Sequence, residues 1–234
     1  MLEVRNVDVG YGEVKVIKNL SMEIGQGKIV ALLGANAAGK TTLISAISGT
    51  LPIHAGEIRF KDKRINNTPA WKIVEKGLIT VPEGRHLFPR LTVQDNLELG
   101  AYSKRSRNVR ERTLDAVYIY FPKLKARKNQ LAGSLSGGEA QMCAIGRGLM
   151  GLPELLVLDE PSLGLSPGMV DFMFETIQAL RQNGTTILLV EQNVVQSLEI
   201  ADFAYVIENG NVALSGEGQK LLDNDGVRKA YLGL

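Results

Sequence analysis

The sequence predicts an α/β fold in which a mostly parallel sheet carries a phosphate-binding loop. Residues 34–42, GANAAGKTT, match the pattern G-x-x-x-x-G-K-[ST], and they stand between an apolar run at 29–33 and apolar residues at helical spacing. Two more apolar runs without alternation, at 155–158 and 185–190, are typical of parallel strands that helices cover on both faces. Together these observations predict a P-loop NTPase fold.

The composition fits one large domain that spans residues 1–234. Hydrophobic residues make up 44% of the 234 residues, which is enough for a sizeable core, and the net charge of +2 gives no reason to expect a nucleic-acid partner. The single cysteine, Cys143, excludes an internal disulfide and suits a reducing compartment. We expect no secretory signal and no membrane-spanning run, so a membrane role requires a partner.

The N-terminal part is predicted to form an antiparallel β subdomain beside the nucleotide-binding core. In residues 1–30, Val7 and Val9 alternate with polar neighbours and glycines mark turns. Residues 51–65 contain a further short alternating run. We expect a helix over 69–76 with Thr68 as its N-cap, followed by a strand over 78–81.

Residues 84–150 are predicted to be a helical insert. Thr92, with Asp95 three residues later, is typical of a capped helix start, and apolar spacing over 109–121 predicts a second helix. This segment holds the densest basic charge, which fits an RNA-binding patch, a lipid-facing patch or a solvated helix face. We favour the solvated face, because acidic and apolar residues interrupt the basic ones.

The remainder is assigned to the nucleotide-binding core. After the strand at 155–158, Pro167 opens a helix that Gly184 is placed to end. The strand at 185–190 leads to a further helix, and Asn209-Gly210 then lies between two strand-like runs as a hairpin turn.

The loop at residues 34–42 predicts a nucleotide site. Its backbone N–H groups and the helix N-terminus can surround phosphate oxygens, Lys40 can reach the β- and γ-phosphates, and Thr41 can ligate Mg²⁺. An ordinary small-residue turn does not explain adjacent Lys and Thr at a helix entrance. The candidate nucleotide-binding residues here are Gly34, Asn36, Ala37, Ala38, Gly39, Lys40, Thr41 and Thr42.

Two acidic residues follow the buried strand at 155–158. Ligands of open α/β sheets bind outside the carboxyl ends of the strands, so Asp159 suits the second Mg²⁺-holding position and Glu160 suits a base that orients or deprotonates the attacking water. Alone, the pair also fits a solvated acidic turn. Together with the phosphate-binding loop it favours nucleotide hydrolysis.

Residues 135–139, LSGGE, form the most discriminating motif. Ser136 and Glu139 make a capping box before a helix, but the glycines between them each cost up to about 1 kcal/mol in a first helical turn. A bare helix N-terminus, where backbone can approach a ligand closely, explains Gly137 and Gly138. We interpret it as a second anion site without a lysine of its own.

With these motifs, the chain resembles the ATPase subunits of ABC transporters over its whole length. Residues 135–139 match that family's signature motif, which implies a helical signature subdomain and a head-to-tail dimer. In such a dimer Ser136, Gly137 and Gly138 contact the ATP of the other subunit. Residues 162–166 fall where the family has its D-loop, although Ser166 replaces the usual Asp.

Tyr11 is similar to the family's aromatic residue that stacks on adenine. Without that context, packing would explain it as well. The absence of an N-K-x-D guanine-reading motif favours ATP over GTP.

Three residues depart from the family pattern. Ala37 stands where the loop usually has glycine; if that position needs a positive φ, alanine costs about 1 kcal/mol, which we expect to be tolerated. Glu83 replaces the Q-loop glutamine and could still approach Mg²⁺ or the attacking water. Gln192 replaces the switch histidine; it can donate a hydrogen bond to phosphate but cannot be protonated. Glu160 is left as the main candidate base.

The runs V-P-E-G-R at 81–85 and V-E-Q-N at 190–193 resemble one branch of the family, the ATPases of branched-chain amino-acid importers. This implies a peripheral protein on the cytoplasmic face of the membrane. Its partners would be a second ATPase subunit, two membrane-spanning permease subunits and, indirectly, a solute-binding protein. The alternatives are a related urea or amide importer and a soluble ABC ATPase without a transport role. A P-loop small-molecule kinase would leave residues 135–139 unexplained.

Overall fold

A computed structural model describes residues 1–224, so the end of the predicted 1–234 domain lies outside the described residues. The N-terminal strands form an antiparallel four-stranded sheet in the order β2-β1-β4-β5. Apolar residues such as Leu2, Val7 and Val9 are fully buried on one face, as the alternation predicts. Its strands are β1 (Leu2–Tyr11), β2 (Val14–Ile24), β4 (Ile53–Phe60) and β5 (Lys63–Arg64).

The second sheet has six strands in the order β10-β9-β3-β8-β7-β6. All neighbours from β9 to β6 are parallel, and only β10 is antiparallel, after the hairpin at Asn209-Gly210. The predicted α/β class with a mostly parallel core is therefore confirmed. Ile29 and Val30 pair with β8 and so belong to this sheet. Its strands are β3 (Ile29–Leu33), β6 (Leu78–Val81), β7 (Leu155–Asp159), β8 (Thr186–Glu191), β9 (Phe203–Glu208) and β10 (Asn211–Gly216).

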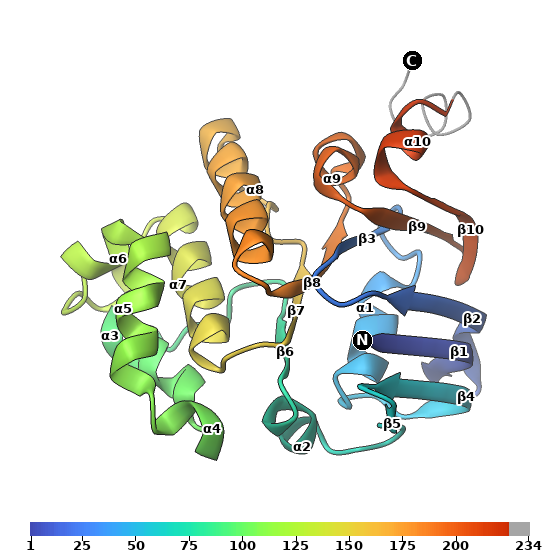
Figure 1. Ribbon diagram of the computed structural model, residues 1–234, viewed down its shortest axis with the longest axis horizontal. Helices are drawn as coiled ribbons and strands as arrows, with labels where there is room; N and C mark the ends of the chain where they lie inside the picture. Colours follow the sequence, from blue (N-terminus) through green and yellow to red (C-terminus); the bar gives the residue numbers. More distant parts are fainter. Residues whose placement is uncertain (225–234) are drawn as a thin grey trace.

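The helices occupy different positions relative to the two sheets. Helix α1 lies between the two sheets, and α3 to α7 gather on the side away from the antiparallel sheet (Figure 1). The α-helices are α1 (Lys40–Ile47), α2 (Ala70–Glu75), α3 (Val93–Glu98), α4 (Lys104–Arg107), α5 (Arg110–Tyr120), α6 (Pro122–Ala126), α7 (Gly137–Met150), α8 (Pro167–Gln182), α9 (Val194–Ile200) and α10 (Gly218–Leu222). Two short 3₁₀ turns are η1 (Leu99–Ala101) and η2 (Ala132–Ser134).

Local sequence signals explain most of the helix ends. The capping boxes at Thr92 and Ser136 are present with both of their hydrogen bonds. The predicted cap at Thr68 is wrong: α2 starts at Ala70 and Pro69 occupies the N-cap position, because an extended ψ of 138° at Pro69 keeps it outside the helix. Among residues 1–224, no helix combines the length and apolarity needed to cross a bilayer.

The basic residues of the helical insert are partly neutralised within the chain. Arg105 pairs with Glu154, Arg110 with Glu98 and Arg127 with Glu139. These pairs fit the solvated helix face that we favoured.

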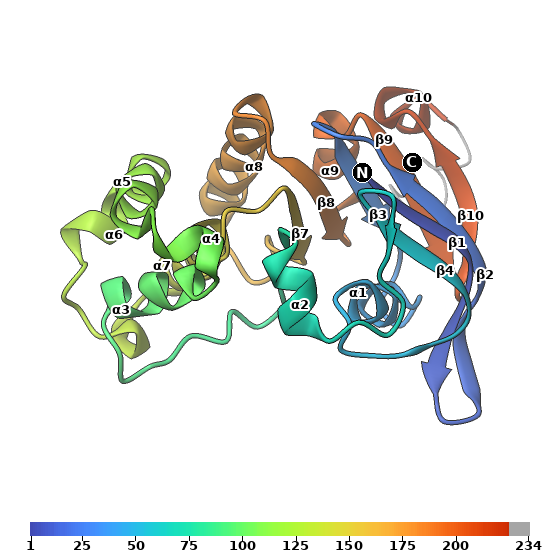
Figure 2. The same cartoon turned by 60° about the horizontal axis from the view of Figure 1, so that its bottom comes forward.

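Parallel pairing brings the functional segments to one edge of the second sheet. Leu33 is opposite Glu191, and Asp159 is opposite Val190, so β3, β7 and β8 end at the same level. The residues that follow each strand therefore meet there, as expected for a site outside the carboxyl ends of parallel strands. Figure 2 shows this edge from another side, with α1 starting beside it.

The phosphate-binding loop bends through left-handed backbone at Ala37, where φ is 64°. The conformation that glycine favours is thus retained although this chain has alanine there. At Gly39, φ is 107° and an added Cβ would lie 2.6 Å from Cδ1 of Ile17, so a side chain is excluded at that position. The loop keeps its shape at the expense of strain at one residue.

Replacing Ala37 by glycine should raise the free energy of unfolding by up to about 1 kcal/mol. Relief of left-handed strain, about 1–2 kcal/mol, exceeds the freedom that glycine adds to the unfolded chain, about 0.4–1 kcal/mol. The thermal unfolding midpoint measures it. Ala35→Gly is the matched control, because Ala35 is exposed in the same loop without a positive φ, and it should lower the midpoint. A lower midpoint for Ala37→Gly would contradict the strain argument.

Candidate phosphate-binding site

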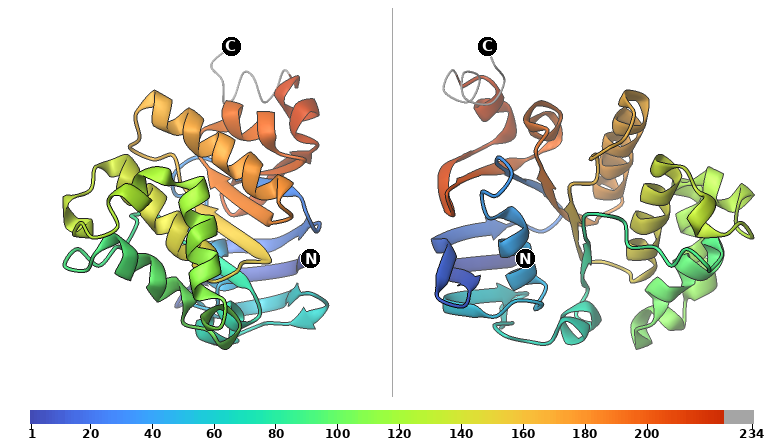
Figure 3. Two further views of the ribbon diagram at one scale, coloured as in Figure 1. Left: turned by 60° about the vertical axis from the view of Figure 1, so that its left-hand side comes forward. Right: turned by 180° about the vertical axis from the view of Figure 1, so that it is seen from behind.

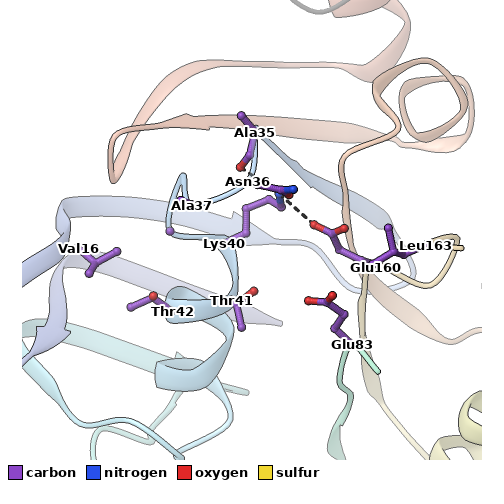
Figure 4. A pocket seen from close by; sticks show the side chains of 11 residues that line it. Val16, Ala35, Asn36, Ala37, Lys40, Thr41, Thr42, Glu83, Glu160 and Leu163 are labelled. Carbon is purple, nitrogen blue, oxygen red and sulfur yellow. Dashed lines mark hydrogen bonds and ion pairs between the residues drawn. The ribbon is translucent and has the colours of Figure 1, made fainter. Parts of the chain in front are cut away.

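The predicted residues of the loop surround a cavity of about 520 Å³ at the edge where the strands end (Figure 4). Residues from α1, from the segment after β6 and from the segment after β7 converge on it, because parallel pairing aligns these segments. Ala38 is buried next to the loop and Gly34 contributes its carbonyl. The lining residues are Val16, Ala35, Asn36, Ala37, Gly39, Lys40, Thr41, Thr42, Glu83, Glu160 and Leu163.

Lys40 is a buried cation with oxygen partners from its own chain. Only 4% of Lys40 is exposed, and its Nζ donates to the carbonyls of Gly34 at 2.7 Å and Ala35 at 3.2 Å. The same atom pairs with Oε1 of Glu160 at 3.1 Å, and Figure 4 shows the two side chains pointing toward each other. A phosphate that enters the cavity must therefore compete with the Glu160 carboxylate for Lys40.

Glu160 is held in place by strained backbone. Its φ is 46°, and its N–H donates to the carbonyl of Val190 on the neighbouring strand at 2.8 Å. A left-handed conformation at a non-glycine residue costs about 1–3 kcal/mol and persists only where the surroundings enforce it. The Glu160 carboxylate is thereby aimed into the cavity rather than along the strand.

Asp159 is a buried carboxylate that forms no salt bridge among the described residues, although the Lys40 charge lies near enough to lower its pKa. It is 3% exposed, and its Oδ1 has no hydrogen-bond partner among residues 1–224. Burial first, and then the nearby carboxylates of Glu160 and Glu83, raise the pKa of Asp159 to about 6. Thr41 and Asp159 also line one smaller cavity of about 290 Å³. A cation between them would supply the missing partner.

Glu191 is a site residue that the sequence interpretation missed. It ends β8, is 2% exposed, and accepts hydrogen bonds from the N–H groups of Ser162 at 2.9 Å and Gln192 at 3.2 Å. Burial raises its pKa. The signal is the same as for Asp159, an acidic residue that ends a buried strand, but the expected strand at 185–190 stops one residue before Glu191.

Gln192 and Tyr11 are not among the residues that line the cavity. Gln192 is exposed beyond the end of β8, close to the same edge of the sheet. Tyr11 is 57% exposed at the end of β1, on the hairpin that projects from the molecule in Figure 2, and Val16 of β2 reaches the cavity in its place.

Ser136, Gly137 and Gly138 lie at the N-terminus of α7, outside this cavity. The Ser136 hydroxyl accepts from the N–H of Glu139 at 3.3 Å, and the Glu139 carboxylate accepts from the N–H of Ser136 at 3.0 Å. The hydrogen bond from the Ser136 backbone holds the pKa of Glu139 below its usual value. An added Cβ at Gly138 would lie 2.9 Å from Cε of Met169, so a side chain there would require the flexible end of Met169 to move. Within one chain, the two predicted anion sites are separate.

Comparison with known proteins indicates the same family as the motifs. A family model described as ABC transporter matches residues 17–163. The high-affinity branched-chain amino acid transport ATP-binding protein BraG of Pseudomonas aeruginosa is 45% identical over 233 residues, which cover 100% of both chains. The lipopolysaccharide export system ATP-binding protein LptB of Escherichia coli is 31% identical over 234 residues, with 99% of this chain and 97% of the relative covered.

Solved structures agree with the fold. An ATP-binding cassette of an ABC transporter in its ADP conformation superposes with a TM-score of 0.87 at 27% identity, covering 100% of this chain and 99% of that one. A nucleotide-free ATP-binding cassette from an ABC transporter gives a TM-score of 0.85 at 26% identity, with 100% and 99% covered. The phosphate-binding loop, the paired acids and the capped α7 thus have a common explanation. The chain belongs to the ABC transporter family, as one of the subunits that bind and hydrolyse ATP.

Proposed function

We propose that this subunit powers the import of branched-chain amino acids. It would act at the cytoplasmic face of the membrane with two membrane-spanning permease subunits and, indirectly, a solute-binding protein. The observation that carries the proposal is the 45% identity to BraG across the full length of both chains, against 31% for the lipopolysaccharide export subunit. The runs at 81–85 and 190–193, which resemble the same branch, support it independently.

The Lys40–Glu160 pair suggests how ATP engages the loop. The γ-phosphate takes the place of the Glu160 carboxylate at Lys40, while the loop N–H groups hold the phosphate oxygens. The freed carboxylate accepts a proton from a water molecule while the oxygen of that water bonds to the γ-phosphorus. The bond between the γ-phosphorus and the oxygen that bridges it to the β-phosphate breaks, and ADP leaves with that oxygen. Gln192 donates to the γ-phosphate, Glu83 faces the same oxygens, and Tyr11 stacks on adenine.

The residues near Asp159 fit Mg²⁺. No group of three His, Cys, Asp or Glu side chains in residues 1–224 forms a closed metal site, and Mg²⁺ commonly uses one or two carboxylates together with phosphate oxygens. The unpartnered Oδ1 of Asp159 and the Thr41 hydroxyl are suitable oxygens, with Glu83 nearby. When bound, the ion would neutralise phosphate charge.

We further propose that two such subunits pair head to tail. Solved cassettes of this fold include dimers, one of them bound to ADP and phosphate. The pairing would bring Ser136, Gly137 and Gly138 of one subunit over the ATP of the other. It explains why the N-terminus of α7, with two glycines in its first turn, lies away from the cavity of its own chain. The second subunit is either another copy or a homologous ATPase.

Uptake of labelled solutes tests the transport assignment. Cells that lack this subunit should lose ATP-dependent uptake of labelled leucine, isoleucine and valine, and the unaltered subunit should restore it. Labelled urea and acetamide form the second arm. Loss of urea or amide uptake alone would assign the related importer instead, and unchanged uptake of every solute would contradict a role in import.

Glu160→Gln should reduce ATP turnover by about 10²–10⁴-fold, because the water loses its base. ATP affinity should stay equal or increase, since glutamine no longer holds Lys40 through an ion pair. Single-turnover hydrolysis and calorimetric titration separate the two effects. Glu175→Gln, an exposed carboxylate on α8, is the matched control. A turnover rate near that of the unaltered chain would exclude Glu160 as the base.

Asp159→Asn should stabilise the nucleotide-free protein at pH 7.5. Because the pKa of Asp159 is raised to about 6 in the folded protein, the folded state favours the neutral carboxyl. Ionised Asp159 therefore lowers the free energy of unfolding fully above pH 6, and this loss disappears as the pH falls to the usual pKa of an aspartate, 3.8. The thermal midpoint should rise by about 2–8 °C, and the further rise on adding Mg²⁺ and ATP should shrink. Asp115→Asn on exposed α5 is the control. An unchanged response to Mg²⁺ would exclude Asp159 as a ligand.

A further inference from the structure

The segment after β6 carries an arginine that neither the loop cavity nor the helix signals explain. Gly84, Arg85 and His86 are three successive left-handed residues, with φ of 82°, 66° and 45°. Arg147 of α7 holds this conformation, because its guanidinium donates to the carbonyls of Arg85 at 3.0 Å and His86 at 2.8 Å. Figure 3 shows the segment leaving β6 and crossing to the helices of the insert.

This backbone places the Arg85 guanidinium against the start of α7. A Cβ added at Gly137 would lie 3.4 Å from Nη2 and 3.5 Å from Nη1 of Arg85. Nε of Arg85 donates to Oε1 of Gln141, one turn further along the helix, at 3.3 Å. A Cβ on Gly164, in the 162–166 segment, would lie 4.0 Å from Nη2. Glycines on both sides therefore leave room for the guanidinium.

The charge of Arg85 has no partner within the described part of the chain. Residues 1–224 offer no salt bridge to Arg85 and no acceptor for Nη1 or Nη2. The carboxylate in the first turn of α7, that of Glu139, accepts from Ser136 and pairs with Arg127 at 3.0 Å. A cation at a helix N-terminus is also opposed by the helix dipole. The partly exposed guanidinium is therefore free to donate to an anion that accepts hydrogen bonds from a planar fork.

We infer that Arg85 binds the terminal phosphate of the ATP held by the other subunit. The inference rests on the proposed head-to-tail pairing. Arg85 does not line the phosphate cavity of its own chain, whereas Gly137 beside it belongs to the motif that the pairing brings onto the partner's ATP. Lys40 of one subunit and Arg85 of the other then contact the γ-phosphate from opposite sides. The second anion site, which the sequence left without a cation, receives one from the segment after β6.

Mixing two defective subunits tests this assignment directly. Arg85→Gln alone should lower ATP turnover by about 10²-fold, the usual effect of removing one such donor. Lys40→Ala alone should be inactive, because its own loop no longer holds ATP. An equimolar mixture should hydrolyse ATP several-fold faster than either variant, since a mixed dimer contains one site with an intact Lys40 and an intact Arg85 from different chains.

The controls separate charge from folding. Arg85→Gln keeps the left-handed strain, so its thermal midpoint and ADP affinity should match the unaltered chain. Arg85→Lys, which keeps the charge without the fork, should recover part of the turnover. Arg112→Gln, on the exposed face of α5, should leave turnover unchanged.

Each remaining outcome has a definite meaning. Full activity of Arg85→Gln, or inactive variants that show no rescue on mixing while the unaltered chain hydrolyses ATP, would overturn the role of Arg85 in trans. No ATP-dependent dimer and no hydrolysis by the unaltered chain with a second ATPase present would contradict the proposed function itself, and this inference with it.

Discussion

The burial of the Lys40 charge is the constraint on which the rest of the site depends. A lysine that is 4% exposed must find oxygens close by, and here two carbonyls of its own loop and the Glu160 carboxylate supply them. The loop that supplies these carbonyls bends through left-handed backbone at Ala37 and Gly39. Glu160 reaches Nζ only because its own backbone is also left-handed. Strain at two non-glycine positions thus prepares a cation for a phosphate.

The parallel sheet explains why negative charge collects around that single lysine. Because the strands end at one level, Asp159, Glu160 and Glu191 all arrive at the same edge, and Glu83 follows from the next strand. Burial and mutual repulsion raise the pKa of Asp159 and of Glu191. This excess of carboxylate weakens the nucleotide-free chain at neutral pH. It is also the environment in which a divalent cation with a polyphosphate gains most from binding.

Local patterns predicted the parts of the fold that short-range physics determines. The strands on either side of the loop, the boxes at Thr92 and Ser136 and the hairpin at Asn209-Gly210 follow from spacing and capping rules. The predicted N-cap at Thr68 is wrong because proline can occupy either the first helical position or an extended N-cap position. Pro69 takes the N-cap position here. The sequence does not determine the φ angle of Ala37. A residue with a Cβ atom adopts left-handed backbone only where the surrounding loop enforces it. Glu191 ends a buried strand just as Asp159 does, so a local signal for it exists. Arg85 depends on a contact with Gln141 in a distant segment, which no local pattern encodes.

Under the proposed pairing, the same non-local contacts leave the single chain an incomplete catalyst. The loop cavity presents Lys40 already paired with Glu160, while the Arg85 guanidinium, which has no salt bridge among residues 1–224, lies beside the N-terminus of α7 and outside that cavity. The loop cavity holds the candidate base Glu160 but no cation free of it. The region at the start of α7 holds the cation Arg85 but no base. Phosphoryl transfer needs both at once, because charge on the γ-phosphate must be balanced while water loses its proton. Under the proposed pairing, assembly brings these separated groups together, so hydrolysis of ATP depends on assembly as well as on side-chain chemistry.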